Sequence, residues 1–143
     1  MISQRCRYAL KAMLNLARES SGLPKQVSAL AIEESIPRKF LEGIMSEMRQ
    51  NGLVESARGK SGGYRLSRPA ELITFGDIMR HIDGPLALLA CVSQNFYKRC
   101  DDCKDEKTCE LRRVMSRVRR EASDILDRTT LADAIAKPEL GVL

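Results

Sequence analysis

The chain has 143 residues, of which 43% are hydrophobic and 4% aromatic, a composition that can bury one mainly aliphatic core. Its net charge of +5 is uneven, because residues 1–68 hold 12 Lys and Arg against 6 Asp and Glu, whereas residues 69–143 hold 12 against 13. Charged residues interrupt the apolar N-terminus and no uncharged stretch could span a bilayer, so we expect a cytoplasmic protein without a membrane segment. The basic first half predicts a surface for a polyanion, the alternative being an ordinary solvated surface.

Three helices are expected in the first 50 residues. Apolar residues recur at helical spacing over residues 4–18, and a short helix with Ser28 as its N-cap follows. Ser35 is expected to cap a third helix over residues 38–50, with Pro37 in its first turn. Five apolar side chains of this third helix are expected to be buried: Phe40, Leu41, Ile44, Met45 and Met48.

A β-hairpin and a fourth helix are expected next. Two short strands, over residues 53–57 and 64–67, flank a Gly-rich basic turn, which is the pattern of a hairpin. Thr74 and Asp77 have the spacing of a capping box, so a short helix is expected from there to about His81.

The last third combines a long loop with a long helix. Residues 86–108 lack regular patterning, and a helix is expected over residues 110–128, where apolar residues alternate at three- and four-residue steps. This seam predicts pairing with a second copy of the chain, the alternative being packing on its own domain. A short amphipathic segment over residues 129–135 follows. The seam consists of Leu111, Val114 or Met115, Val118, Ala122, and Ile125 or Leu126.

The order of helix, short helix, turn, helix and basic hairpin is that of a winged helix-turn-helix. We therefore predict a mainly α fold with a small β-hairpin wing and a long C-terminal dimerisation helix. The expected divisions are a DNA-binding domain (1–84), a cysteine-bearing loop (85–109), and a dimerisation helix with a short tail (110–136).

Candidate DNA-binding residues follow from this fold. The first turns of a recognition helix meet base edges, so Arg38 and Lys39 are candidates for guanine edges or phosphates, and Glu42 for cytosine. Ser28 is expected to donate to a phosphate beside a helix N-terminus. The tip of the hairpin adds two cations and a hydroxyl for the minor groove or the phosphates: Arg58, Lys60 and Ser61.

Three stretches carry a resemblance to a known family: RYALKAMLNLA, FLEGIMSEMRQNGLVESARGKSGGYRLSRP and ITFGDIMRHIDGPLAL. They resemble the Rrf regulators, a winged-helix family with IscR, NsrR, RirA and CymR types, and the resemblance runs from residue 1 to about residue 135. It implies a homodimeric transcription regulator, not an enzyme, that binds roughly palindromic double-stranded DNA operators.

Four of the five cysteines fall within residues 91–109, with the spacing C-x8-C-x2-C-x5-C. Thiolates are ligands for iron–sulphur clusters and for zinc. The resemblance is strongest to the IscR-like members, and it implies that Cys91, Cys103 and Cys109 hold a [2Fe–2S] or [4Fe–4S] cluster that reports iron–sulphur, iron, nitric oxide or redox status. IscR-type members have a histidine ligand where this chain has Arg112, which stays protonated and cannot ligate.

Several alternatives stay open at this point. The fourth ligand could be the extra Cys100, Glu110, a partner's Cys6, or none, although a lone cysteine such as Cys6 is more often a small buried residue. A zinc site made by all four loop cysteines, or a thiol switch, would replace the cluster. His81 follows Asp77 by one turn, but no nucleophile or phosphate-binding loop accompanies them, so an enzyme is not expected. A protein-interaction module that uses only the C-terminal seam is the remaining class.

Overall fold

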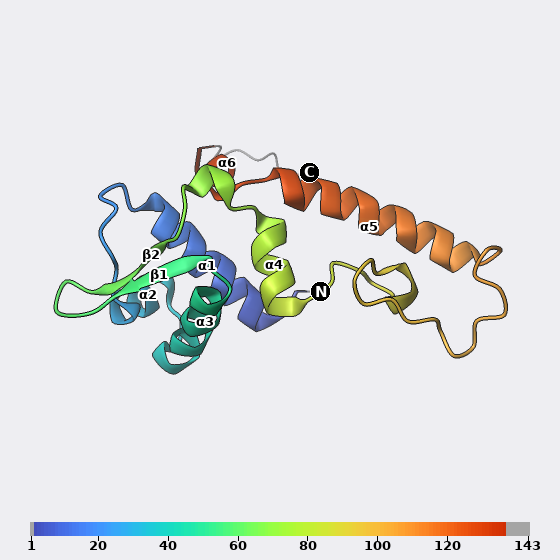
Figure 1. The fold of residues 1–143 in the computed structure, drawn as a ribbon, viewed down its shortest axis with the longest axis horizontal. Helices are drawn as coiled ribbons and strands as arrows, with labels where there is room; N and C mark the ends of the chain where they lie inside the picture. The colour runs from blue at the N-terminus through green and yellow to red at the C-terminus, as the bar shows by residue number, and fades with distance from the viewer. Residues whose placement is uncertain (1, 137–143) are drawn as a thin grey trace.

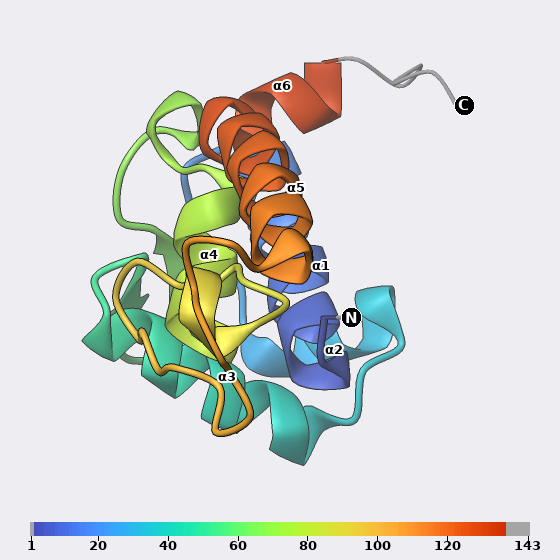
Figure 2. The same cartoon turned by 90° about the vertical axis from the view of Figure 1, so that its right-hand side faces the viewer.

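The computed structural model describes residues 2–136, which extend along one axis (Figure 1). The winged domain lies at one end and the cysteine-bearing loop at the other, and the long helix α5 runs from the loop back to the winged domain (Figures 1 and 2). The described helices are α1 (Gln4–Arg18), α2 (Val27–Glu34), α3 (Arg38–Gln50), α4 (Phe75–Asp83), α5 (Glu110–Arg128) and α6 (Leu131–Ala136), with short 3₁₀ helices at Ala70–Leu72 and Ala90–Val92. Strands β1 (Val54–Ala57) and β2 (Gly63–Leu66) pair antiparallel, with Glu55 opposite Arg65.

The core of the winged domain forms around α1, which contacts α2, α3, α4, α6 and β2. Leu131 of α6 is fully buried in this core, so the chain returns to the winged domain after α5. The largest fully buried side chains are aliphatic, as the composition predicts: Met13, Leu30, Leu41, Ile44, Met45, Met48, Leu53, Ile73, Ile78 and Leu131.

The predicted fold class is confirmed, and the expected bounds of three helices agree with those of α1, α3 and α5. The capping box is also present, because the Thr74 side chain accepts from the Asp77 N–H while the Asp77 carboxylate accepts from the Thr74 N–H. The helix that it begins continues to Asp83, two residues beyond the expected end.

Three local predictions are wrong. Ser28 is not an N-cap, because α2 begins at Val27 and Gln26 is its N-cap. Ser35 does not cap α3: it ends α2 in the left-handed conformation, with φ 53°, and Pro37 is the N-cap of α3. Phe40 is 67% exposed, since the buried stripe of α3 follows the spacing that starts at Leu41 and leaves Phe40 to one side.

The C-terminal end of α5 is fixed to α4. Arg80 of α4 makes a two-pronged ion pair with Asp127 of α5, with nitrogen–oxygen distances of 2.6 and 2.8 Å. The backbone then pairs Thr74 with Thr130. The pKa of Asp127 is lowered by the hydrogen bonds from Arg80. This attachment fixes the orientation of α5 relative to the winged domain.

Candidate functional site

The first turn of α3 presents the expected recognition residues to solvent. Arg38 Nε donates to Glu42 Oε1 at 2.8 Å, four residues along the helix. The side chains of both partners are at least half exposed, and an exposed ion pair of this kind contributes little free energy. Lys39 makes no side-chain hydrogen bond or ion pair within the described residues. Lys39 is therefore an unpaired cation, whereas Arg38 reaches a base only by releasing or sharing Glu42.

The wing is attached to the start of α2. The backbone of Tyr64 in β2 exchanges two hydrogen bonds of 2.8 Å with Lys25, and the Gln26 side chain donates to the Lys60 carbonyl at 3.0 Å. Gly63 permits this close approach, because it has φ +133° and a Cβ there would lie 2.3 Å from the carbonyl carbon and oxygen of Lys25. The wing and the N-terminus of α2 therefore form one continuous surface.

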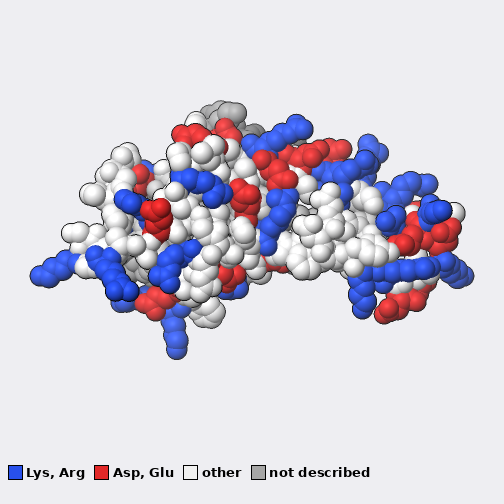
Figure 3. Space-filling view, viewed as in Figure 1, with Lys and Arg blue, Asp and Glu red and all other residues white. Residues whose placement is uncertain are grey.

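The tip of the wing carries side chains without partners in the described part of the chain: Arg58, Lys60 and Ser61, all exposed. Behind the tip, Arg65 Nη2 lies 3.1 Å from Glu55 Oε2, so the strands themselves are close to neutral. Figure 3 shows Lys and Arg side chains projecting at the wing end of the molecule. Contact of these unpaired cations with phosphates stays a prediction.

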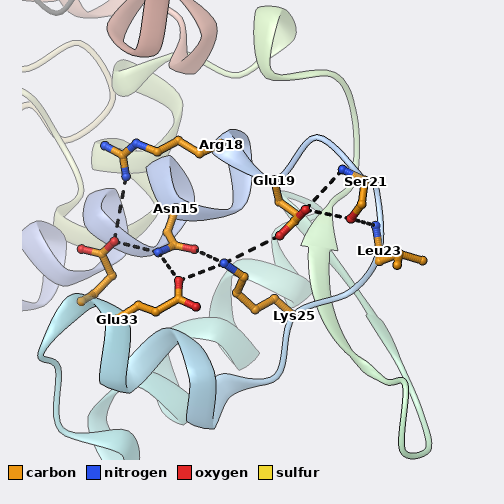
Figure 4. A network of polar contacts seen from close by, with 8 residues as sticks. Asn15, Arg18, Glu19, Ser21, Leu23, Lys25 and Glu33 are labelled. Carbon is orange, nitrogen blue, oxygen red and sulfur yellow. Dashed lines mark hydrogen bonds and ion pairs between the residues drawn. The ribbon is translucent and has the colours of Figure 1, made fainter.

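A polar network holds α2 and the loop before it against α1 (Figure 4). Asn15, which is 8% exposed, donates to Glu33 at 2.9 Å and to Glu34 at 2.8 Å, and accepts from Lys25 at 2.8 Å. Lys25 also pairs with Glu33 at 2.9 Å and with Glu19 at 3.8 Å. The hydrogen bonds from Asn15 and then Lys25 lower the pKa of Glu33. Because Lys25 also pairs with the wing through its backbone, this network positions both parts of the candidate DNA surface.

Ser28 lies in the first turn of α2, half-buried, with its hydroxyl 3.5 Å from Gln26 Oε1. It is next to the free backbone N–H groups of the helix start, where an anion would be stabilised. Its contact with a phosphate stays a prediction.

The four loop cysteines line one cavity of about 280 Å³: Cys91, Cys100, Cys103 and Cys109. The cavity lies between the short helix at residues 90–92, the following loop and the first turn of α5, where Leu111 and Arg112 complete its wall. The loop and the start of α5 that line it lie at the end of the molecule opposite the wing (Figure 1). Sequence positions spread over nineteen residues are thus brought to a single site.

Hydrogen bonds organise the thiols of this cavity. The Cys100 thiol is hydrogen-bonded to that of Cys91, and this bond, followed by burial, raises the pKa of Cys100. The N–H of Cys103 donates to the Cys100 carbonyl at 3.1 Å, which closes the turn between them. The N–H of Arg112 donates to Cys109 Sγ at 3.4 Å, and its guanidinium donates to the Cys91 carbonyl at 3.3 Å. Within residues 2–136, no three His, Cys, Asp or Glu side chains converge on the position of a single metal ion.

Cys6 lies elsewhere, fully buried on α1. Burial, and then the charge and hydrogen bond of Asp83, raise the pKa of its thiol to about 11. It does not line the cysteine cavity of its own chain. His81 is exposed, and Asp77, one turn before it, is engaged in the capping box and lies 3.6 Å from Arg68.

The apolar seam of α5 divides between two environments. Met115, Ala122 and Leu126 are half-buried, and α5 packs against the chain's own α4 and the short helix at residues 90–92. Four aliphatic side chains stay in water, with exposed fractions of 41–65%: Leu111, Val114, Val118 and Ile125. A stripe of this kind is unusual on a helix that has no partner.

The sequence interpretation missed the elements that position the DNA surface. Neither the Lys25–Tyr64 pairing nor the Asn15 network was expected. One signal was available, since Asn15 interrupts the apolar stripe of α1 between Ala12 and Leu16, and a buried amide needs partners.

None of the helices in the described part of the chain combines the length and the apolar run that a membrane span needs.

Residues 2–137 match the Rrf2 family, described as iron-dependent transcriptional regulators. An HTH-type transcriptional regulator of Rhodobacter capsulatus described as rrf2-like is 40% identical over 139 residues, which cover 95% of this chain and 93% of that protein.

Solved structures agree with this similarity. CymR, the global cysteine regulator of B. subtilis, superposes with a TM-score of 0.78 at 32% identity, covering 95% of this chain and 96% of CymR. IscR of T. potens superposes with a TM-score of 0.76 at 26% identity, covering 100% of this chain and 92% of IscR.

Proposed function

The chain belongs to the Rrf2 family of helix-turn-helix transcriptional regulators, and on this basis we propose that it is a cytoplasmic homodimer that controls transcription through an iron–sulphur cluster. The cluster is ligated by Cys91, Cys103 and Cys109, and its presence reports iron–sulphur, iron, nitric oxide or redox status. The observation that carries this proposal is the cavity at the N-terminal end of α5, which these three cysteines line together. Family members and relatives are regulators rather than enzymes.

The donor chemistry of the cavity residues suits such a group. Thiolates are the protein ligands that iron–sulphur clusters use, and here they surround a space rather than a point. The guanidinium of Arg112 lies beside them and would offset the negative charge of thiolate ligands. When bound, a cluster supplies a centre that oxygen, nitric oxide or iron shortage can alter.

DNA binding uses two kinds of contact in this proposal. Lys39, Arg58 and Lys60 have no partner in the described residues, so they can neutralise phosphates without breaking an ion pair. Arg38 and Glu42 read base edges, and their mutual ion pair holds both side chains at the start of α3. Ser28 and Ser61 add hydroxyl donors to phosphates.

Dimerisation through α5 follows from its exposed seam. Pairing two copies would cover Leu111, Val114, Val118 and Ile125, which otherwise stay in water. A two-fold dimer presents two recognition helices, which must meet half-sites about one helical turn apart. The operator is therefore expected to be roughly palindromic.

In this proposal, metal occupancy of the cavity is coupled to DNA binding through the path of the chain. Cys91 follows the segment that leaves α4, and Cys109 is the N-cap of α5. Ligation by both would fix the path of the chain between α4, which packs on the winged domain, and the helix that forms the dimer. A change in that path alters the separation of the two recognition helices and so the operator that the dimer accepts.

A zinc site or a thiol switch is the second candidate. The presence of Cys91 and Cys100 in one cavity, and the similarity to the cysteine regulator CymR, favour the thiol switch. Colour separates the candidates, because iron–sulphur protein is brown whereas zinc and thiol forms are colourless.

The proposal is tested by replacing Cys91, Cys103 and Cys109 singly with alanine and purifying each variant without oxygen. Each change should remove iron and acid-labile sulphide and alter binding to a duplex selected from a random DNA library. Cys6→Ala is the matched control, because Cys6 lies outside the cavity, and it should keep its iron. Full iron in Cys91→Ala or Cys109→Ala would overturn the ligand assignment, and one zinc per chain would favour the second candidate.

A further inference from the structure

The family resemblance assigns three of the four cavity cysteines to the cluster: Cys91, Cys103 and Cys109. It assigns no ligand role to the fourth, Cys100. We infer that Cys100 completes a set of four thiolate ligands with Cys91, Cys103 and Cys109, so that each chain ligates its cluster without a residue from its partner. The inference rests on the proposed function for the identity of the cluster, but the four-thiolate set can be tested separately.

The structure brings Cys100 to the same cavity as the other three. Its side chain is half-buried, and it lines the cavity wall together with Cys91, Cys103 and Cys109. The 3.1 Å bond from the Cys103 N–H to the Cys100 carbonyl closes a tight turn, and both cysteines of this C-x2-C pair line the cavity. Pairs with this spacing are common ligands of iron–sulphur clusters and of zinc.

The other candidates for a fourth ligand are engaged elsewhere. Arg112 occupies the position at which IscR-type members have a histidine ligand. Its guanidinium stays protonated and contacts the Cys91 carbonyl and Glu106. Cys6 is fully buried beside Asp83. Glu110 is exposed on the first turn of α5 and does not line the cavity.

Two carboxylates also line the cavity, and they are weaker candidates than Cys100. The Asp105 carboxylate accepts from the N–H of Lys107 and from the Thr108 hydroxyl, so it already closes a turn. Asp102 is exposed, and its carboxylate is a harder ligand than a thiolate. Among the described lining residues, Cys100 therefore offers the ligand that matches the other three.

This ligand set makes two consequences measurable. With four cysteines from one chain, no iron keeps a position open to added ligands. Cluster loading is also independent of dimerisation, since the partner contributes nothing to the site.

The experiment compares anaerobically reconstituted wild-type protein with Cys100→Ala and with the control Cys6→Ala. We expect wild type and Cys6→Ala to show no absorption change on adding imidazole. Cys100→Ala should bind imidazole at its open iron and release iron to EDTA at least roughly tenfold faster, since even the loss of an outer partner costs about 10–100-fold in metal affinity. Imidazole response and iron release equal to wild type in Cys100→Ala would overturn the inference.

A second arm uses Val118→Asp with Ile125→Asp, which is designed to separate the subunits. The monomer should hold as much iron and sulphide per chain as wild type, with the same spectrum. Iron that is lost with the dimer would show that the partner supplies a ligand, and would overturn the inference.

The two proposals fail in different ways. Wild-type protein with one zinc per chain and no sulphide would refute the cluster, while loss of that zinc in Cys100→Ala would still support the four-thiolate set. Zinc retained in Cys100→Ala would overturn the four-thiolate set as well. Wild-type protein that takes up no metal on reconstitution would overturn both.

Discussion

Replacing Val118 and Ile125 of α5 with aspartate should convert the dimer into a monomer. In the single chain Val118 is 41% and Ile125 65% exposed, and they share the seam with the half-exposed Leu111 and Val114. Burying a whole aliphatic side chain contributes roughly 1.5–3 kcal/mol. Covering the exposed half of each seam residue therefore contributes roughly 0.7–1.5 kcal/mol.

The size of the effect follows from this estimate. The double variant changes half of the exposed seam in each subunit, which removes roughly 3–6 kcal/mol from the association of two chains. Since about 1.4 kcal/mol corresponds to a factor of ten, the dimer Kd should rise by roughly two to four orders of magnitude. The charge of aspartate weakens the association of the two chains further, because each carboxylate would be buried in the dimer without a partner.

Analytical ultracentrifugation over a range of concentrations measures this Kd. The matched control is Arg113→Asp with Arg120→Asp, which introduces the same side chains with the same seven-residue spacing on the exposed, charged side of α5. The control should remain dimeric, and the seam variant should also lose tight operator binding. An unchanged dimer Kd in the seam variant would refute the assignment of this helix face.

Three further predictions concern the winged domain and its junction with α5. Lys60→Ala should weaken binding to all duplexes about equally and reduce the log–log salt slope by roughly 0.9, as measured by fluorescence anisotropy; an unchanged slope would contradict a phosphate contact. Gly63→Ala should lower Tm, because its Cβ would lie 2.3 Å from the main chain before α2. Gly43→Ala is the control: its Cβ would have nothing within 4 Å, so it should raise Tm. Equal Tm changes in the two variants would contradict the close approach of Gly63 to the Lys25 backbone. Because Arg80 lowers the pKa of Asp127 in the folded state, their ion pair stabilises above the unfolded carboxyl pKa of about 4 and is lost as pH falls through the folded value. Asp127→Asn should therefore be less stable than wild type to urea at neutral pH, with a difference that shrinks in acid, and a difference that does not change with pH would contradict this.

The parts of the fold that the sequence predicted are those with local causes. The bounds of α3 follow from Pro37 at its start and Asn51-Gly52 at its end, and the capping box at Thr74 begins α4. The start of α2 has a distant cause, because backbone pairing of Lys25 with Tyr64 in the wing holds the preceding chain extended up to Gln26. No local pattern near Ser28 shows that contact.

For the candidate sites, too, the sequence predicted the features with local patterns and missed those that depend on contacts between distant residues. The dense spacing of the cysteines indicates a shared function, and the basic turn indicates a wing. The sequence could not show that Cys100 lines the same cavity as Cys91, because the loop between them has no periodicity that fixes its path. It also could not show that Cys6 is buried beside Asp83, since that contact joins residues of α1 and α4.

The iron and acid-labile sulphide content of protein purified without oxygen decides whether the cysteine cavity holds an iron–sulphur cluster. We expect brown protein with iron and sulphide in equal amounts, and loss of both in Cys91→Ala. Colourless wild-type protein, with zinc or without metal after anaerobic reconstitution, would contradict it.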